Sequence, residues 1–247
     1  MIAVIGAMEE EVAILRNEMR DVRVEKHACF EFFVGKLCEE EVVLLRCGVG
    51  KVQAAVGCST LIGKYAPRAV INTGSAGGVN PAGGQPLRFG DAVVSSSLAY
   101  HDVDVTAFGY APGQLPGQAT RYYPATKELV EAALEAVRSL KAEGALDKDF
   151  TALAGLICSG DAFIADTKKV LALEAAFPGL RAVEMEGAAI AHACAMFDVP
   201  FVALRCLSDI AGEESIVAFD EYLPAAARNS SAIVKRLVKN IRKTTFR

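Results

Sequence analysis

The sequence predicts an α/β fold, namely a single-domain three-layer αβα sandwich with a twisted, mixed but mainly parallel central sheet. Three observations lead to this prediction. Short Val- and Ile-rich stretches alternate with longer helical patterns along the chain. These stretches are apolar at successive positions, which is typical of strands covered on both faces. No linker, repeat or change of composition divides the 247 residues, so one domain over residues 1–247 is expected.

The expected elements follow from these patterns in chain order. Continuous apolar runs predict strands at 2–5, 41–47, 69–73, 92–98, 154–158 and 201–206. Apolar residues spaced by three and four predict helices at 10–19, 53–65, 127–142, 166–176, 186–197 and 225–242. Two Gly- and Pro-rich segments, 80–88 and 109–117, are expected to be loops, where functional residues often lie.

Charge and hydropathy exclude several classes of function. The chain has 26 Lys and Arg against 30 Asp and Glu, so it lacks the basic excess that a phosphate backbone requires, and no nucleic acid is expected as a partner. No apolar run approaches the roughly 20 residues of a membrane-spanning helix, so no membrane partner is expected. The apolar N-terminus soon meets Glu9, unlike a signal peptide, and a cytoplasmic location is therefore expected.

Metal and cofactor signatures are also missing from the sequence. The seven cysteines are widely spaced without a C-x-x-C, which is typical of reduced thiols in a cytoplasmic protein. The three histidines form no H-E-x-x-H pattern, and no G-x-S-x-G marks a nucleophilic serine. We therefore expect neither a metal nor a cofactor.

Two glycine-containing loops follow expected strands. Gly48-Val49-Gly50-Lys51 is not a phosphate-binding loop of the Walker type, because Val52 stands where Ser or Thr is needed. The second loop, 73–78, has the sequence Thr-Gly-Ser-Ala-Gly-Gly at the end of a strand. Ligands of open α/β sheets bind at the carboxyl ends of strands, and small residues let a ligand approach the backbone. A tight turn is the alternative interpretation.

Three acidic residues stand where apolar surroundings make them costly. Glu11 shares a helical face with Met8, Val12 and Leu15, although helix N-termini favour acids in any case. Glu186 precedes a helix of small and apolar residues, where it is either a ligand-binding group or a cap. Asp209 follows the apolar run 201–207, where the alternative is an N-cap. Several carboxylates at one sheet edge favour acid–base chemistry.

Taken together, these segments resemble the nucleoside phosphorylase/hydrolase superfamily, and within it the bacterial family of 5'-methylthioadenosine/S-adenosylhomocysteine nucleosidases. Their order and spacing hold over nearly the whole chain. The matching segments are 4–12 (VIGAMEEEV), 48–52 (GVGKV), 72–78 (NTGSAGG), 100–110 (YHDVDVTAFGY), 113–117 (GQLPG), 159–164 (SGDAFI), 183–186 (VEME), 189–192 (AIAH) and 205–209 (RCLSD). The loop 81–88 and the segment 143–151 look longer than in typical members of the family.

The resemblance implies hydrolysis of the N-glycosidic bond of 5'-methylthioadenosine and S-adenosylhomocysteine. In this scheme Asp209 is the general acid at adenine N7, and a raised pKa keeps it protonated. Glu11 orients and deprotonates the attacking water, since two carboxyl groups around an oxocarbenium-like centre are the general logic of glycoside hydrolysis. Glu186 is the third catalytic residue and holds the ribose hydroxyls, with Met185 packed on the sugar.

The resemblance also implies the remaining contacts of an adenine thionucleoside. Ser75 helps to position the water or the ribose, Phe163 stacks on adenine, and the backbone of Ile164 reads the ring edge. Ser208 and Arg205 support Asp209. Further substrate-binding positions are Met8, Val49, Ala76, Gly77, Glu184 and Phe219. The family completes its site across a homodimer interface, and Val105, Phe108 and Pro116 match the segment that the partner subunit contributes.

Three alternatives stay open at this point. A phosphorylase of the same superfamily uses phosphate as the nucleophile, but Glu9, Glu10 and Glu11 would repel a phosphate dianion. A hydrolase of aminodeoxyfutalosine or 5'-deoxyadenosine shares the residues that recognise adenine, so the sequence separates it poorly. A non-catalytic nucleoside-binding protein is expected to lack one of the three carboxylates, and all three are present.

Overall fold

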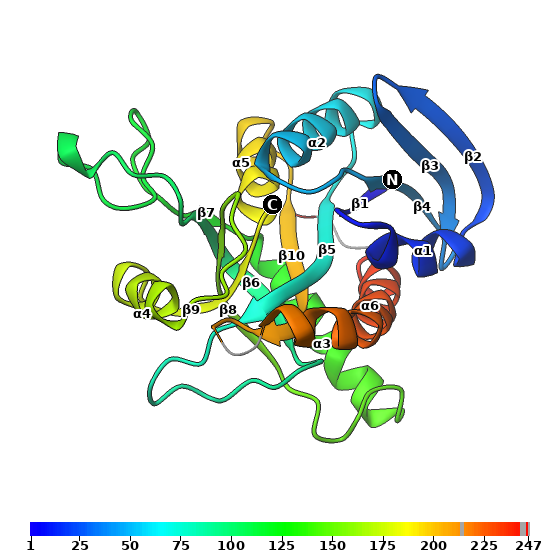
Figure 1. Cartoon of the computed structure of the whole chain (residues 1–247). Helices are drawn as coiled ribbons and strands as arrows, with labels where there is room; N and C mark the ends of the chain where they lie inside the picture. The colour runs from blue at the N-terminus through cyan, green and yellow to red at the C-terminus, as the bar shows by residue number, and fades with distance from the viewer. Residues whose placement is uncertain (213–214, 243–245, 247) are drawn as a thin grey trace.

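The structure is a computed structural model that describes residues 1–212, 215–242 and 246, without the side chains of residues 215–218 and 220. In the described chain, all strands join one mixed sheet with helices on both faces (Figure 1). The strands are β1 (Ile2–Gly6), β2 (Arg20–His27), β3 (Phe30–Leu37), β4 (Glu40–Arg46), β5 (Val70–Gly78), β6 (Ala92–Tyr100), β7 (Tyr123–Pro124), β8 (Ala152–Ser159), β9 (Leu180–Glu184) and β10 (Phe201–Ile210). The helices are α1 (Glu9–Glu18), α2 (Lys51–Tyr65), α3 (Lys127–Ala142), α4 (Thr167–Ala176), α5 (Gly187–Met196) and α6 (Ser215–Asn240), with a 3₁₀ turn η1 (Thr106–Phe108).

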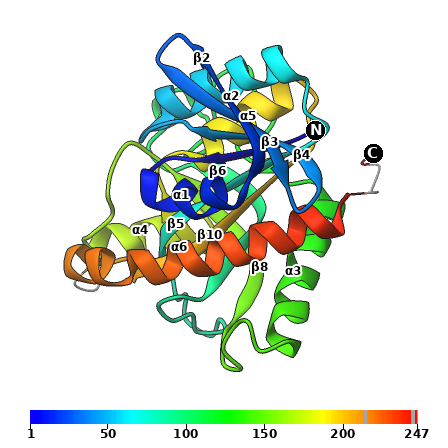
Figure 2. The ribbon, with the colours of Figure 1, turned by 90° about the vertical axis from the view of Figure 1, so that its right-hand side faces the viewer.

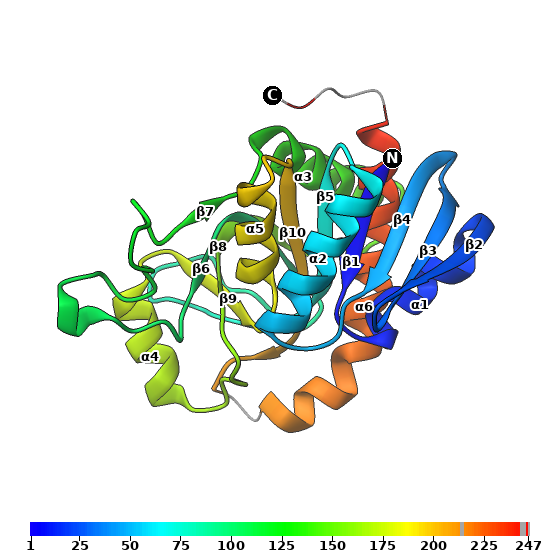
Figure 3. The ribbon, with the colours of Figure 1, turned by 90° about the horizontal axis from the view of Figure 1, so that it is seen from above.

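The helices divide between the two faces of the sheet. Buried side chains of α2 and α5 share one core cluster with the sheet, whereas those of α1, α3 and α6 share another. The view from above shows α2 and α5 next to each other, and the side view shows α6 running along most of the opposite face (Figures 2 and 3). This arrangement confirms the predicted α/β class, in which apolar strands are covered on both faces.

The sheet is more closed than an open sandwich. β10 pairs parallel with β5 and antiparallel with β6, while β9 pairs parallel with β8 and antiparallel with β5. Strands β5, β10, β6, β8 and β9 therefore form a ring, from which β1, β4, β3 and β2 extend as an open wing. Within this ring Gly77 lies between Val183 of β9 and Asp209 of β10. The closure brings the end of β9 to the ends of β5 and β10, although β9 runs in the opposite direction.

The six predicted strands and six predicted helices are all present, with shifted ends, but several elements were not predicted. β3 and its exposed partner β2 form an antiparallel hairpin that extends the sheet. β9 is short, and β7 consists of two residues. Helix α6 begins at Ser215, ten positions before the predicted start at 225, and contains Pro224. The segments 80–88 and 109–117 are loops, as predicted.

None of the helices in the described part of the chain is both long enough and apolar enough to cross a membrane.

Candidate active site

A cavity of about 200 Å³ lies where the ends of β5, β9 and β10 meet the first turn of α1. Most of the site residues predicted for one subunit line it, and they arrive from distant parts of the chain. The lining residues are Ala7, Met8, Glu11, Val49, Ser75, Ala76, Gly77, Phe163, Val183, Glu184, Met185, Glu186, Ser208, Asp209 and Phe219. Ala7 and Val183 were missed by the sequence analysis, although each is adjacent to a predicted residue. The fold therefore assembles one site from the predicted segments.

Glu11 is buried at the third position of α1, and its carboxylate turns back toward the chain before the helix. Its Oε2 accepts hydrogen bonds from the backbone N–H groups of Ala7 (2.8 Å) and Met8 (3.1 Å). Its Oε1 accepts from the backbone N–H of Ser75 (2.9 Å) and from Ser75 Oγ (3.1 Å). Glu11 thus caps α1, in line with the preference of helix N-termini for acidic residues. It also links α1 to the end of β5 inside the cavity.

Residues 73–78, which were expected from the sequence to form a loop, belong to strand β5, and the close approach of Glu11 explains why they are small. A Cβ atom added to Gly74 would lie 2.8 Å from Glu11 Oε1, and one added to Gly77 would lie 3.0 Å from Asp209 Oδ2. Both glycines therefore leave space for a carboxyl group of the site. From the sequence, these small residues were predicted to let a ligand approach the backbone. In the structure they let the protein's own carboxyl groups, those of Glu11 and Asp209, approach it.

Asp209 reaches the cavity from an irregular position in β10. The pairing of β10 with β5 shifts register between Leu207 and Asp209, with Ser208 as the extra residue. Such bulges re-aim side chains, and they are common beside active sites. Ser208 Oγ donates a hydrogen bond to Asp209 Oδ1 (3.0 Å), and both residues are buried. A carboxyl group thus faces the cavity from the strand side, while Glu11 faces it from the helix side.

Glu186 is placed between two helix starts. It precedes α5, and its Oε1 accepts a hydrogen bond from the backbone N–H of Gly50 (2.7 Å), the residue before α2. Burial, followed by the negative charge of Glu184, raises the pKa of Glu186 to about 8, against the opposing effect of the Gly50 hydrogen bond. Near neutral pH this carboxyl group is therefore mostly protonated.

The raised pKa of Glu186 predicts a pH-dependent stability. Its pKa is about 8 in the folded protein against 4.5 for the ordinary group, so the folded state binds the proton more tightly. Stability from this group is present below pH 4.5 and is lost as the pH rises toward 8. We expect Glu186→Gln to raise the melting temperature relative to the unmodified chain at about pH 9, more than it does at about pH 5. A difference in melting temperature that stays constant across this range contradicts the assignment.

Glu184, which lines the cavity, forms a buried ion pair with Arg205. Arg205 Nη2 donates to Glu184 Oε2 (2.7 Å) and to Asn72 Oδ1 (2.6 Å). Glu184 also accepts the backbone N–H groups of Glu186 (2.9 Å) and Gly187 (2.8 Å), so it caps α5. Burial favours the neutral form of Glu184, but the charge of Arg205 and these hydrogen bonds lower its pKa overall. A buried arginine needs an acidic partner, and for Arg205 this partner is Glu184.

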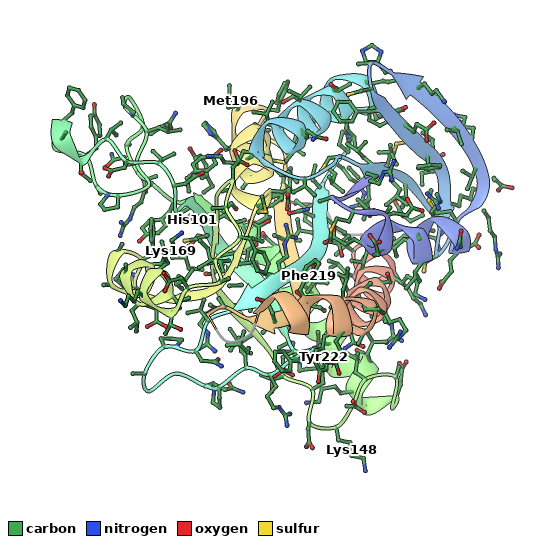
Figure 4. The ribbon with its side chains drawn as sticks, viewed as in Figure 1. His101, Lys148, Lys169, Met196, Phe219 and Tyr222 are labelled. Atoms are coloured by element: carbon green, nitrogen blue, oxygen red, sulfur yellow. The ribbon has the colours of Figure 1, made fainter. Side chains whose placement is uncertain are left out.

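Two aromatic side chains also line the cavity. The rings of Phe163 and Phe219 meet edge to face, with centroids 6.1 Å apart and planes at 83°. Figure 4 shows Phe219 on the first part of α6, beside the end of β5. Phe163 is half exposed, which leaves its ring accessible to a flat ligand. The cavity thus combines an aromatic wall with an acidic wall.

Some predicted residues lie outside the cavity lining. Ile164 is buried behind Phe163, in a cluster with Val170 and Ala211. Val105, Phe108 and Pro116 lie on the segment 101–122, which projects from the body of the molecule (Figures 1 and 3). Phe108 is 81% exposed at the tip of this projection.

A larger surface hollow of about 570 Å³ lies between residues 88–91 and 147–150. Two of its charged side chains, those of Arg88 and Asp91, are hydrogen-bonded to the backbone of the fold. Asp91 accepts the backbone N–H groups of Arg88 (2.9 Å) and Thr151 (2.7 Å), and Arg88 Nη2 donates to the carbonyl of Asp149 (2.6 Å). The smaller cavity, with its converging carboxyl groups, is therefore the candidate active site. Within the described chain, no three ligand-type side chains cluster as a metal site.

Comparison with known proteins shows the family to which the chain belongs. The sequence model of the family described as the phosphorylase superfamily matches residues 1–239 of this chain. The 5'-methylthioadenosine/S-adenosylhomocysteine nucleosidase of Geobacillus thermodenitrificans is 50% identical over 232 residues, which cover 94% of this chain and 93% of that protein. The chain belongs to this nucleosidase family. The resemblance inferred from the sequence motifs is thereby confirmed.

Solved structures of this superfamily agree with the fold. The nucleosidase of Colwellia psychrerythraea 34H, in complex with adenine, has a TM-score of 0.91 and 43% identity, and the match covers 100% of this chain and 97% of that one. The futalosine hydrolase of Helicobacter pylori has a TM-score of 0.86 but 28% identity, with 96% of each chain covered. The fold is thus common to both activities, while sequence identity is higher with the nucleosidase.

Proposed function

We propose that the chain hydrolyses the N-glycosidic bond of 5'-methylthioadenosine and S-adenosylhomocysteine, releasing adenine and the thioribose product. The observation that carries this proposal is the convergence of Glu11 and Asp209 on one cavity, from α1 and from β10. Carboxyl groups on two sides of a cavity suit a reaction that needs both an acid and an activated water. The family of the chain supports the choice of substrate.

Asp209 is the general acid in this proposal. Adenine is a poor leaving group unless its N7 is protonated, so a carboxylic acid near N7 lowers the barrier to bond cleavage. The bulge at Ser208 turns Asp209 toward the cavity, and the hydrogen bond from Ser208 Oγ fixes Oδ1. Arg205 supports this part of the strand indirectly, because it ties β10 to Glu184 and Asn72.

Glu11 orients and deprotonates the attacking water. In the described chain its carboxylate accepts four hydrogen bonds, from Ala7, Met8 and twice from Ser75, which fixes its position before substrate binds. Ser75 Oγ, 3.1 Å from Glu11 Oε1, lies where it can also bind the water or the ribose. A fixed base removes much of the entropy cost of bringing the water to the sugar.

The remaining contacts follow from the two walls of the cavity. Glu186 accepts hydrogen bonds from the ribose hydroxyls, and Met185 packs on the sugar ring. Phe163 stacks on adenine, while the backbone of Ile164 reads its edge. The 5'-substituent lies among the apolar side chains that line the rest of the cavity, which are Met8, Val49 and Phe219.

A homodimer completes the site in this proposal. Val105, Phe108 and Pro116 lie on the projecting segment, where they can reach a second copy. Apolar side chains are also exposed on α2 and α5, where Val52 is 74% and Met196 (labelled in Figure 4) is 76% exposed. Exposed apolar patches of this kind mark interfaces. A sedimentation measurement that finds only monomers at micromolar concentration contradicts the homodimer.

Phosphorolysis is the less favoured reaction for this cavity. None of the described residues that line it is Lys, Arg or His, whereas four of them are carboxylic acids. The guanidinium of Arg205, which contacts the lining residue Glu184, is paired with it in a buried ion pair. A phosphate dianion would thus meet negative charge without a compensating cation, while neutral water meets no such penalty.

The deciding experiment measures adenine release from methylthioadenosine by the purified chain in phosphate-free buffer, before and after phosphate is added. We expect adenine and free methylthioribose at a rate that phosphate does not change. A ribose 1-phosphate that appears only with phosphate contradicts hydrolysis. Aminodeoxyfutalosine and 5'-deoxyadenosine are assayed in parallel, and a higher kcat/KM for either would replace the proposed substrate.

A further inference from the structure

Three charged side chains outside the reaction scheme form a network beside the cavity. Lys51 begins α2, Asp102 follows β6, and Asp161 follows β8. Lys51 Nζ donates to Asp102 Oδ2 (2.6 Å) and lies 3.9 Å from Asp161 Oδ2. The backbone N–H of Asp161 also donates to Asp102 Oδ2 (2.9 Å). One lysine and two aspartates thus join three segments that are far apart in the sequence.

The network holds the start of α2. The residue before α2 is Gly50, which has no side chain to cap the helix, and its φ is +98°. Asp161 supplies the missing cap, because its Oδ1 accepts the backbone N–H of Lys51 (2.8 Å). A Cβ atom on Gly50 would lie 3.1 Å from this same oxygen. The peptide around Gly50 is therefore fixed by contact with Asp161.

The start of α2 also donates a hydrogen bond to Glu186. The backbone N–H of Gly50, one residue before the N–H that Asp161 binds, donates to Glu186 Oε1 at 2.7 Å. Asp161 and Glu186 thus accept consecutive N–H groups of one helix terminus. This hydrogen bond is directional whether Glu186 is protonated or ionised, so the orientation of its carboxyl group depends on the position of the Gly50 peptide.

The other end of the network holds the segment that carries Phe163. The backbone N–H of Gly160 donates to the carbonyl of Glu184 (3.1 Å), and the ring of His101 (labelled in Figure 4) packs directly against Gly160. Partial burial opposes ionisation of Asp102, but the hydrogen bonds from Lys51 and Asp161 lower its pKa overall, so it is charged at neutral pH. The three residues therefore form a charged clamp between α2 and the segment before Phe163.

We infer that Asp161, held by Lys51 and Asp102, is a positioning residue that fixes the Gly50 peptide and, through it, the carboxyl group of Glu186. This inference rests on the proposed function, in which Glu186 binds the ribose hydroxyls. Asp161 is not among the described residues that line the cavity, so its effect passes through Glu186. A loss of Asp161 therefore weakens the reaction most where the substrate carries both ribose hydroxyls.

The experiment compares kcat/KM for 5'-methylthioadenosine and for its 2'-deoxy analogue in the full chain. We expect Asp161→Ala to lower the value about tenfold for the first substrate and about twofold for the second. Asp161→Asn retains an oxygen for the Lys51 N–H, so it is expected to stay within about threefold of the unmodified chain. Lys51→Met, which releases the clamp from its other end, is expected to show the same substrate dependence as Asp161→Ala.

Asp166 offers a matched control. It also caps a helix, because its Oδ1 accepts the backbone N–H of Lys168 (2.8 Å) at the start of α4, but it has no contact with Gly50 or Glu186 in the described chain. Asp166→Ala is expected to change both kcat/KM values equally and by less than about twofold.

Three results would overturn the inference. Equal losses on both substrates with Asp161→Ala show a merely structural role for this residue. A loss with Asp161→Asn as large as with Asp161→Ala shows that the N–H contact is not the cause. An unmodified chain that releases no adenine overturns the proposed function and this inference together, whereas normal release with equal losses overturns the inference alone. Melting temperatures show whether each variant is folded.

Discussion

Asp209→Asn is expected to lower kcat for adenine release from methylthioadenosine about a thousandfold while the fold persists. An amide cannot give up a proton to N7, so adenine must leave as a poor anionic group. The side chain keeps its size and can still accept the hydrogen bond from Ser208 Oγ. The measurement is single-turnover release of adenine, together with the melting temperature of the variant.

Two controls separate this effect from a general loss of structure. Asp91 is a second buried aspartate, and its two oxygens accept backbone N–H groups from Arg88 and Thr151. Asp91→Asn is expected to lower the melting temperature and to preserve kcat. A thioribosyl substrate with a p-nitrophenol leaving group needs no protonation, so Asp209→Asn should cleave it nearly as fast as the unmodified chain. Adenine release at the normal rate by Asp209→Asn rules out this residue as the general acid.

Glu11→Gln is expected to lower kcat at least about a hundredfold and also to destabilise the fold. The amide is a far weaker base than a carboxylate, so the attacking water is no longer activated. One of the two Glu11 oxygens becomes an NH₂ group that faces backbone donors from Met8 and Ala7 or from Ser75. An unmet buried donor costs about 1–3 kcal/mol, which we expect as a loss in free energy of unfolding.

Glu10 is the control for Glu11, because it precedes it in the same helix turn and is exposed. Glu10→Gln removes an equal charge from the start of α1, so it reproduces any general electrostatic effect on the helix. We expect it to leave kcat unchanged and to change stability by less than about 1 kcal/mol. If Glu10→Gln and Glu11→Gln lower kcat equally, the proposed base is wrong.

The strands and helices with strong apolar patterns were predictable because burial imposes them locally. β1 is a continuous apolar run and β5 begins with Val70 and Ile71, while the helix face that contains Val12 and Leu15 packs on the core as expected. The hairpin of β2 and β3 was missed because β2 is an exposed edge strand with alternating charges, so no apolar pattern marks it. The start of α6 was missed because Pro224 interrupts the helical pattern, although the helix continues through it.

For the candidate site, the sequence predicted the acidic residues better than it predicted their hydrogen-bond and ion-pair partners. Residues in unusual surroundings, such as Glu11 beside apolar positions and Asp209 after an apolar strand, stand out in the sequence because a buried acid is costly without a partner. The cavity lining contains them together with Glu186. The partners that these side chains contact were harder to predict from the sequence. Arg205 was expected to support Asp209, and the sequence did not show that its ion-pair partner is Glu184, 21 positions away on β9.

The sequence by itself determined the α/β class, most of the elements, and which acidic residues need a special environment, since each of these depends on the pattern of neighbours along the chain. Only the tertiary structure decided the closure of the sheet around β9, the bulge at Ser208, and the clamp between Lys51, Asp102 and Asp161. These features depend on groups 50 or more positions apart or on a single extra residue in a strand. Hydrogen bonds of this kind require donors and acceptors that only the folded chain brings together in the right direction, so the apolar pattern along the chain does not contain them.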